Sequence, residues 1–106
     1  MAETAKDKLV RFLDRRAFDP VLKAKPDRYS ESQQRKLGDV QRRTETEKDR
    51  FEHYRSARDV VVNFKRDLDS EPARKVHREL KDLGLPTIVD IKDEFLKLAD
   101  DLHVGA

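Results

Sequence analysis

The chain has no cysteine and no tryptophan, and only three glycines and four prolines among its 106 residues. Without cysteine it can form no disulfide, bind no metal through thiolates and use no cysteine nucleophile. The glycines are scattered, so no glycine-rich loop is available to cradle a phosphate group. These absences exclude several classes of enzyme and of metal protein.

Long apolar runs are also missing. No stretch approaches the roughly 18 apolar residues that a membrane-spanning helix needs. The opening segment, MAETAKDKLVRFLDRR, is amphipathic rather than apolar, so a secretory signal is not expected. We therefore expect a cytoplasmic protein with no membrane partner.

Charged residues make up 43% of the chain, whereas Leu, Ile, Val and Phe together account for 27 residues. That apolar content exceeds the disorder signature of less than about 20%, but it allows only a thin core. A thin core in a short chain is often completed by a second copy or a partner. We expect one folded domain over residues 1–106.

Apolar residues recur at the spacing of an α-helix and nowhere alternate as they would in a strand. The pattern predicts an all-α bundle of five or six helices, with one long polar helix and a compact three-helix C-terminal half over 57–103. The expected helices cover residues 5–17, a short segment after Asp19-Pro20, and residues 31–54, 57–68, 71–83 and 88–103.

Most expected helix starts carry a residue that can cap exposed backbone amides. These residues are Thr4 with Asp7, Asp19 before Pro20, Ser30 with Gln33, Ser56 with Asp59, Ser70, and Thr87 with Asp90. Gly84 suits a left-handed C-cap, and Pro86 prevents the helix from continuing. Two alternatives stay open. Gly38 could break the long helix, and that helix could instead continue through Arg55-Ser56, although the box at Ser56 favours a break there.

Two helices have clear apolar faces. The last helix has the cleanest face, formed by Ile88, Ile91, Phe95, Leu98 and Leu102. The 57–68 helix is expected to bury Ala57, Val61, Phe64 and Leu68, with Val60 beside that stripe. Val60, Val61 and Val62 are consecutive and cannot share one helical face. One of them must point towards another helix, a second copy or solvent.

The segment 41–50, QRRTETEKDR, contains no apolar residue. A helix with nothing to bury is not stable alone. We interpret this segment as a solvated arm held at one end by Leu37 and Val40 and at the other by Phe51 and Tyr54.

The net charge of +2 hides an asymmetry, since residues 1–22 carry +1, residues 23–66 carry +5 and residues 67–106 carry −4. The two opposite surfaces could attract each other within or between copies, or the basic part could dock an acidic protein partner. Alternatively, the basic helix could bind a nucleic-acid backbone. That site would use Arg35, Lys36, Arg42, Arg43, Lys48 and Arg50, but interleaved acids weigh against it.

Candidate chemistry is sparse. The three histidines are His53, His77 and His103. Two pairs come closest to the spacing of metal ligands on a helix, namely Asp49 with His53 and Asp100-x-x-His103. One chain supplies too few ligands, so a metal-dependent enzyme would need a site at a dimer interface. Ser30, Ser56 and Ser70 are expected to act as caps rather than nucleophiles. No catalytic residue, cofactor site or metal site is predicted.

We therefore expect a non-catalytic helical protein that acts by self-association, with a dimer favoured, or by docking a protein partner. The expected partner-binding residues are Phe51, Tyr54, Val60 and Val62. A nucleic-acid-associated protein is the alternative, and a metal-dependent enzyme at a dimer interface is a further one.

Overall fold

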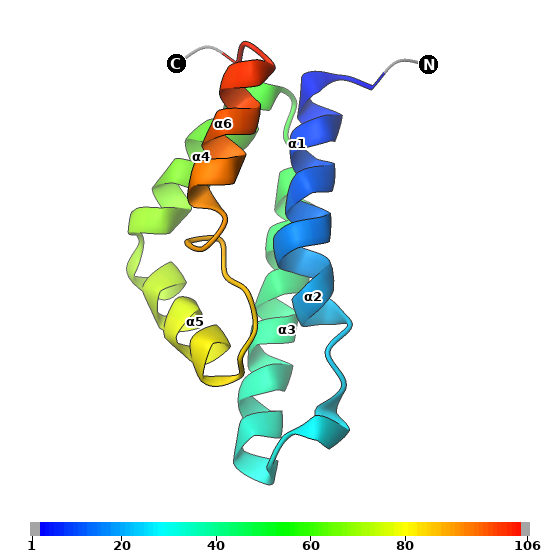
Figure 1. Ribbon diagram of the computed structural model, residues 1–106, viewed down its shortest axis with the longest axis vertical. Coiled ribbons are helices and arrows are strands. Elements are labelled where there is room, and N and C mark those ends of the chain that lie inside the picture. Colours follow the sequence, from blue (N-terminus) through cyan, green and yellow to red (C-terminus); the bar gives the residue numbers. More distant parts are fainter. Residues whose placement is uncertain (1–2, 105–106) are drawn as a thin grey trace.

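Helices dominate the computed structural model, which describes residues 3–104 and contains no strand in that range (Figure 1). The predicted all-α class is confirmed. The α-helices are α1 Ala5–Leu13, α2 Asp19–Leu22, α3 Glu31–Glu52, α4 Ala57–Asp69, α5 Glu71–Asp82 and α6 Lys92–Asp101. A π-helical turn, η1 Asp14–Phe18, joins α1 to α2, and a 3-10 turn, η2 Pro26–Arg28, precedes α3.

Side-chain caps start four of these helices where the sequence predicts them. The hydroxyl of Thr4 accepts from the Asp7 amide at 3.1 Å, and Ser30 and Gln33 form the reciprocal box at the start of α3. Ser56 caps α4 and Ser70 caps α5. The long helix therefore ends at Glu52 and a new one begins at Ala57, which confirms the expected break. Gly38 lies inside an uninterrupted α3.

The N-terminal segment differs from the expectation of two capped helices. Asp19 has helical geometry and its side chain caps nothing; its amide donates to the carbonyl of Asp14, five residues back. The helical path is therefore continuous from α1 to α2 through one wide turn. In a regular helix the ring of Pro20 would clash with the carbonyl of Arg16. The wide turn avoids this clash.

The last helix begins later than predicted. Thr87 and Asp90 do form their reciprocal bonds, both at 3.2 Å, but these close only a single turn. Ile91 then departs from helical geometry, so α6 starts at Lys92. Ile91, just before the helix, is buried together with Phe95 and Ala99 of α6, while Ile88, Leu98 and Leu102 of the predicted stripe are only partly buried.

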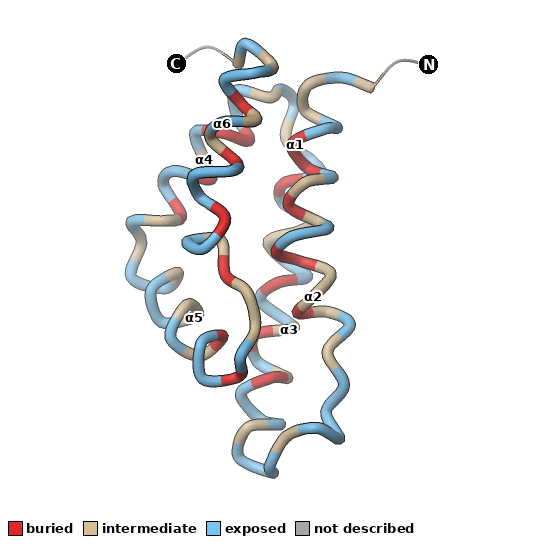
Figure 2. The backbone as a smooth tube through the Cα atoms, viewed as in Figure 1, coloured by how far each residue is buried: buried red, intermediate tan, exposed pale blue. Residues whose placement is uncertain are grey.

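The core consists of two apolar clusters, and Figure 2 marks the buried positions along the chain. The larger one joins α1, α4 and α6, and at its centre the rings of Phe64 and Phe95 stack with centroids 4.0 Å apart. The smaller one joins α2, α3 and the end of α5 through Val21, Leu37, Val40, Leu80 and Leu83. Both ends of the polar segment 41–50 are thus held by core residues, as expected, since Phe51 belongs to the larger cluster.

Two helices end in left-handed residues. Gly84 follows α5 with φ of 70°, and the amide of Leu85 donates to the carbonyl of Leu80 at 2.9 Å. This is the predicted glycine cap. The same motif follows α6, but there the left-handed residue is His103, with φ of 56°.

Candidate ligand-binding cleft

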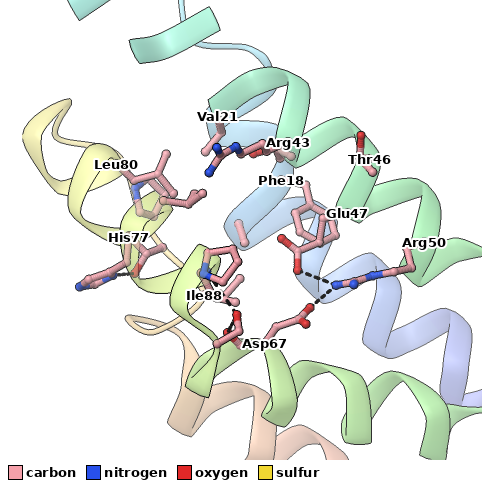
Figure 3. A pocket seen from close by; sticks show the side chains of 18 of the residues that line it. Phe18, Val21, Arg43, Thr46, Glu47, Arg50, Asp67, His77, Leu80 and Ile88 are labelled. Atoms are coloured by element: carbon pink, nitrogen blue, oxygen red, sulfur yellow. Dashed lines mark hydrogen bonds and ion pairs between the residues drawn. The ribbon is translucent and has the colours of Figure 1, made fainter. Parts of the chain in front are cut away.

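A cleft of about 650 Å³ lies between α3 on one side and α4 and α5 on the other (Figure 3). Its floor combines the end of the N-terminal helical segment with residues 86–88. The apolar lining comprises Ala17, Phe18, Val21, Pro72, Ala73, Val76, Leu80, Pro86 and Ile88. The polar lining comprises Arg42, Arg43, Thr44, Thr46, Glu47, Arg50, Arg66, Asp67, Ser70, His77 and Thr87.

The cleft is bounded at both ends of its α3 wall. Its lining along α3 runs from Arg42 to Arg50. Just before this stretch, Val40 packs in the smaller cluster with Leu80 of α5. At its far end, Arg50 forms an ion pair with Asp67 of α4. Contacts therefore join α3 to the opposite wall on either side of the opening.

The bounded end near α4 holds a carboxyl pair around one guanidinium. Arg50 donates to Glu47 at 3.1 Å and also to Asp67 (Figure 3). The side chain of Glu47 is 28% exposed and that of Asp67 is 11% exposed. Burial, followed by the hydrogen bond and charge of Asp67, raises the pKa of Glu47 to about 8, against the opposing effect of Arg50. The Glu47 carboxyl is therefore largely protonated at neutral pH.

The remaining arginines of the cleft differ in their partners. Arg42 pairs with Asp39 on its own helix. Arg66 donates to the side-chain oxygen of Asn63. Within residues 3–104, neither Arg43 nor Arg66 forms an ion pair. The cleft thus has two guanidinium groups whose charge no carboxylate of the described chain neutralises.

A hydrogen bond secures the floor segment against α5. Nδ1 of His77 lies 2.9 Å from Oγ1 of Thr87, which is 1% exposed. Asp90, one turn further, pairs with Lys81 of α5 at 2.8 Å. Burial opposes ionisation of Asp90, but the hydrogen bond from Lys81 is the larger effect and lowers its pKa. These contacts make the floor a fixed surface rather than a loose loop.

Four of the six basic residues predicted for nucleic-acid binding form ion pairs with carboxylates of the chain. Lys36 pairs with Asp82 of α5, and Lys48 approaches Asp19 at 3.9 Å. Arg50 is taken by Glu47 and Asp67, as described above, and Arg42 by Asp39. In the part of the chain that the structure describes, this leaves Arg35 and Arg43 without an ion pair.

The predicted partner-binding residues are divided between core and surface. Phe51 and Val60 are fully buried in the larger cluster, so they cannot contact a partner while the chain is folded. Tyr54 is half-buried and packs edge-on against Phe51, with ring centroids 5.4 Å apart. Val62 is 53% exposed. The consecutive valines resolve as expected, with one of the three pointing to solvent.

The candidate metal and nucleophile residues have local roles. Nδ1 of His53 lies 2.6 Å from the backbone carbonyl of Asp49, so this ring nitrogen is already engaged by the backbone of its own helix. No group of three or more side chains suited to a metal ion occurs among residues 3–104. Ser30, Ser56 and Ser70 cap helices, as predicted.

Sequence reasoning missed the cleft because it treated segment 41–50 as solvated throughout. The spacing of Arg43, Glu47 and Arg50 could have indicated it, since residues four and three apart share a helix face. Thr44 in the same segment is buried and donates to the carbonyl of Val40 at 2.6 Å. One side of the polar segment thus faces the interior.

Comparisons with protein-family models, with curated proteins and with solved structures find no match to this chain. Over residues 3–104, none of the helices combines the length and the apolar composition needed to cross a membrane.

Proposed function

We propose that the chain is a non-catalytic binding protein that holds a compact, largely apolar ligand in the cleft. The observation that carries this proposal is a cleft of about 650 Å³ with an apolar floor and walls joined on both sides of the opening. Small-molecule sites commonly occupy about 300–1,000 Å³ and combine apolar lining with a few polar groups. The cleft has this size and this composition.

The bounded ends favour a compact molecule over a helix of a partner protein. A docked helix lies along a groove that is open at its ends, because it places anchors over several turns. Here the smaller cluster, which contains Val40 of α3 and Leu80 of α5, lies at one end, and the ion pair of Arg50 with Asp67 crosses the other. A ligand that fits between them is short.

The polar groups of the cleft support binding rather than catalysis. Glu47 and Asp67 are both held by Arg50, and Ser70 is engaged as a cap. His77 bonds to Thr87, so one of its ring nitrogens is already occupied. These groups give the cleft its polarity and its shape.

Binding of a neutral fluorescent probe, N-phenyl-1-naphthylamine, tests the proposal. The wild-type chain is expected to enhance probe fluorescence, and Ala73→Trp, which fills the cleft from the first turn of α5, is expected to abolish most of that enhancement. Ala5→Trp adds the same ring at the start of α1, outside the cleft lining, and serves as the matched control. Equal enhancement by the two variants would contradict a ligand site in the cleft.

Self-association stays a second proposal, supported by exposed Val62 on α4 and by the opposite net charges of segments 23–66 and 67–106. Sedimentation equilibrium over a wide range of protein concentration tests it. A dimer that Val62→Glu dissociates is the expected result. A monomer at every concentration would remove this second function and leave the cleft proposal intact.

A further inference from the structure

We propose that the ligand of the cleft is an amphiphilic anion, with an apolar body on the cleft floor and a carboxylate or phosphate group bound by Arg43. This inference rests on the proposed function, since it names the chemistry of the molecule that the cleft holds. It is carried by the arrangement of charge around the apolar lining.

Arg43 is placed to bind a charged group at the mouth of the cleft. Its side chain extends from α3 across the opening towards Leu80 (Figure 3). The residue is exposed and forms no ion pair within residues 3–104. A guanidinium group binds carboxylate and phosphate oxygens through two parallel donors. Arg43 therefore has both the position and the free donors that an anion requires.

The remaining charge of the cleft favours an anion as well. Arg66 adds a second unneutralised guanidinium on the opposite wall, from α4. The lining contains four arginines against Glu47 and Asp67. Because the raised pKa of Glu47 keeps most of that carboxyl neutral at pH 7, Asp67 is left as the main negative charge. An anion entering the cleft thus meets a net positive surface.

A cationic ligand finds no comparable partner. The two carboxyl groups that could receive it, Glu47 and Asp67, already share Arg50. A cation would have to displace that guanidinium while passing Arg43 at the mouth. A neutral apolar molecule could occupy the floor, but it would leave Arg43 unused.

The apolar floor fixes where the body of the ligand lies. Phe18 and Val21 of the floor are 2% and 1% exposed, and Leu80 of the α5 wall is 6% exposed, so these side chains are packed from behind and expose little area. Ile88 of the floor and Val76 of the α5 wall are only partly buried, so they present the apolar area that a ligand can cover. A molecule seated on this surface removes apolar area from water, which supplies binding energy in proportion to the area covered.

Competition against N-phenyl-1-naphthylamine tests the inference with four probes that share one chain length: dodecanoate, dodecyl phosphate, dodecanol and dodecylammonium. The three ionic amphiphiles are used below their critical micelle concentrations, and dodecanol is used below its solubility limit. Either anion is expected to compete at least ~10-fold better than dodecanol, and dodecylammonium is expected to compete worse than dodecanol. Whether dodecanoate or dodecyl phosphate binds more tightly then distinguishes a carboxylate ligand from a phosphate ester.

Two variants assign the effect to Arg43. Arg43→Gln is expected to reduce anion affinity about 10-fold and to leave dodecanol affinity unchanged. Arg35→Gln removes the same charge from an exposed position of α3 that does not line the cleft, and it is the matched control. Both side chains are exposed, so both variants are expected to fold, which urea unfolding verifies.

The possible results separate the two proposals. If dodecanol competes as well as both anions and Ala73→Trp abolishes its binding, the cleft binds a ligand but the inference that this ligand is an anion is wrong. If no amphiphile competes and Ala73→Trp changes nothing, the proposed function itself fails. If Arg35→Gln lowers the affinity for the anions as much as Arg43→Gln does, general surface charge accounts for the preference. Arg43 then does not bind the anionic group directly.

Discussion

Arg50 on α3 donates to the carboxylate of Asp67 on α4, a residue 17 positions further along the chain. The pair joins two helices across the break that separates them, and it forms one boundary of the cleft. Asp67 is nearly buried whereas Arg50 is partly exposed, with side chains 11% and 41% accessible. Breaking the pair is therefore expected to cost more free energy at the mostly buried carboxylate than at the more exposed guanidinium.

Arg50→Gln is expected to lower the free energy of unfolding by about 1–2 kcal/mol, because Asp67 would remain in a mostly buried position without its cation. Urea denaturation measures the change. Arg42→Gln removes an exposed pair with Asp39 and is expected to cost less than about 0.5 kcal/mol. Equal losses in the two variants would show that the Arg50 pair contributes no more than a surface contact.

Stability is expected to fall as pH rises between about 4.5 and 8, because of Glu47. Its pKa rises from 4.5 to about 8 in the folded chain, chiefly through burial. Across this window the folded state keeps a proton that the unfolded state has released, so ionisation favours unfolding. Glu47→Gln removes this effect. Its stability relative to wild type is expected to increase by about 1–2 kcal/mol from pH 5 to pH 8.

Urea unfolding at several pH values measures that difference. Glu45→Gln, at an exposed position of the same helix, is the matched control and is expected to leave the pH profile of stability unchanged. A flat difference between Glu47→Gln and wild type would mean that the pKa of Glu47 is the same in the folded and unfolded chain, with Arg50 offsetting the effect of burial.

Two tyrosine hydroxyls predict opposite effects of the same substitution. The hydroxyl of Tyr54 is buried and has no hydrogen-bond partner within residues 3–104, whereas that of Tyr29 donates to the carbonyl of Leu83 at 3.0 Å. Tyr54→Phe is therefore expected to raise the free energy of unfolding by up to about 1 kcal/mol, and Tyr29→Phe to lower it by about 1 kcal/mol. Thermal and urea unfolding of both variants check the signs. A loss in both would mean that water satisfies Tyr54.

The two left-handed helix ends also form a matched pair. Gly84→Ala places a Cβ where φ is 70°, and it is expected to cost about 1–2 kcal/mol. His103→Gly relieves the same strain at φ of 56° and is expected to stabilise the chain by about 1 kcal/mol, the gain being reduced by the flexibility of glycine when unfolded. Differential scanning calorimetry resolves both shifts. Destabilisation by His103→Gly would indicate that the imidazole itself supports the end of α6.

Local features were predictable from the sequence, and contacts between distant segments were not. Caps such as Ser56 depend on residues three positions apart, so they can be read directly, and they located the break between α3 and α4. The same reasoning placed a start at Thr87, where the bonds formed but the helix did not continue. A cap satisfies amides in any single turn, and tertiary packing decides whether the turn becomes a helix.

The cleft escaped prediction for a related reason. Glu47 and Arg50 lie in a segment without apolar residues, and composition alone favours full solvation for it. The partial burial of Glu47 and the ion pair of Arg50 with Asp67 arise because the fold brings distant segments, α5 among them, alongside α3. Only the shared face of Arg43, Glu47 and Arg50 was visible in the sequence, and that spacing occurs on many solvated helices.

The π-helical turn at Asp14–Phe18 makes the chain unequally tolerant of changes in length. Each residue of an α-helix accounts for about 100° of rotation. Deleting one residue from this turn would restore regular helix and rotate Phe18 away from Phe51, whose ring centroid lies 5.9 Å from its own, and Val21 away from the smaller cluster. The exposed turn at Pro26–Arg28 buries no residue, so insertions are expected to be accepted there and rejected within the π-helical turn.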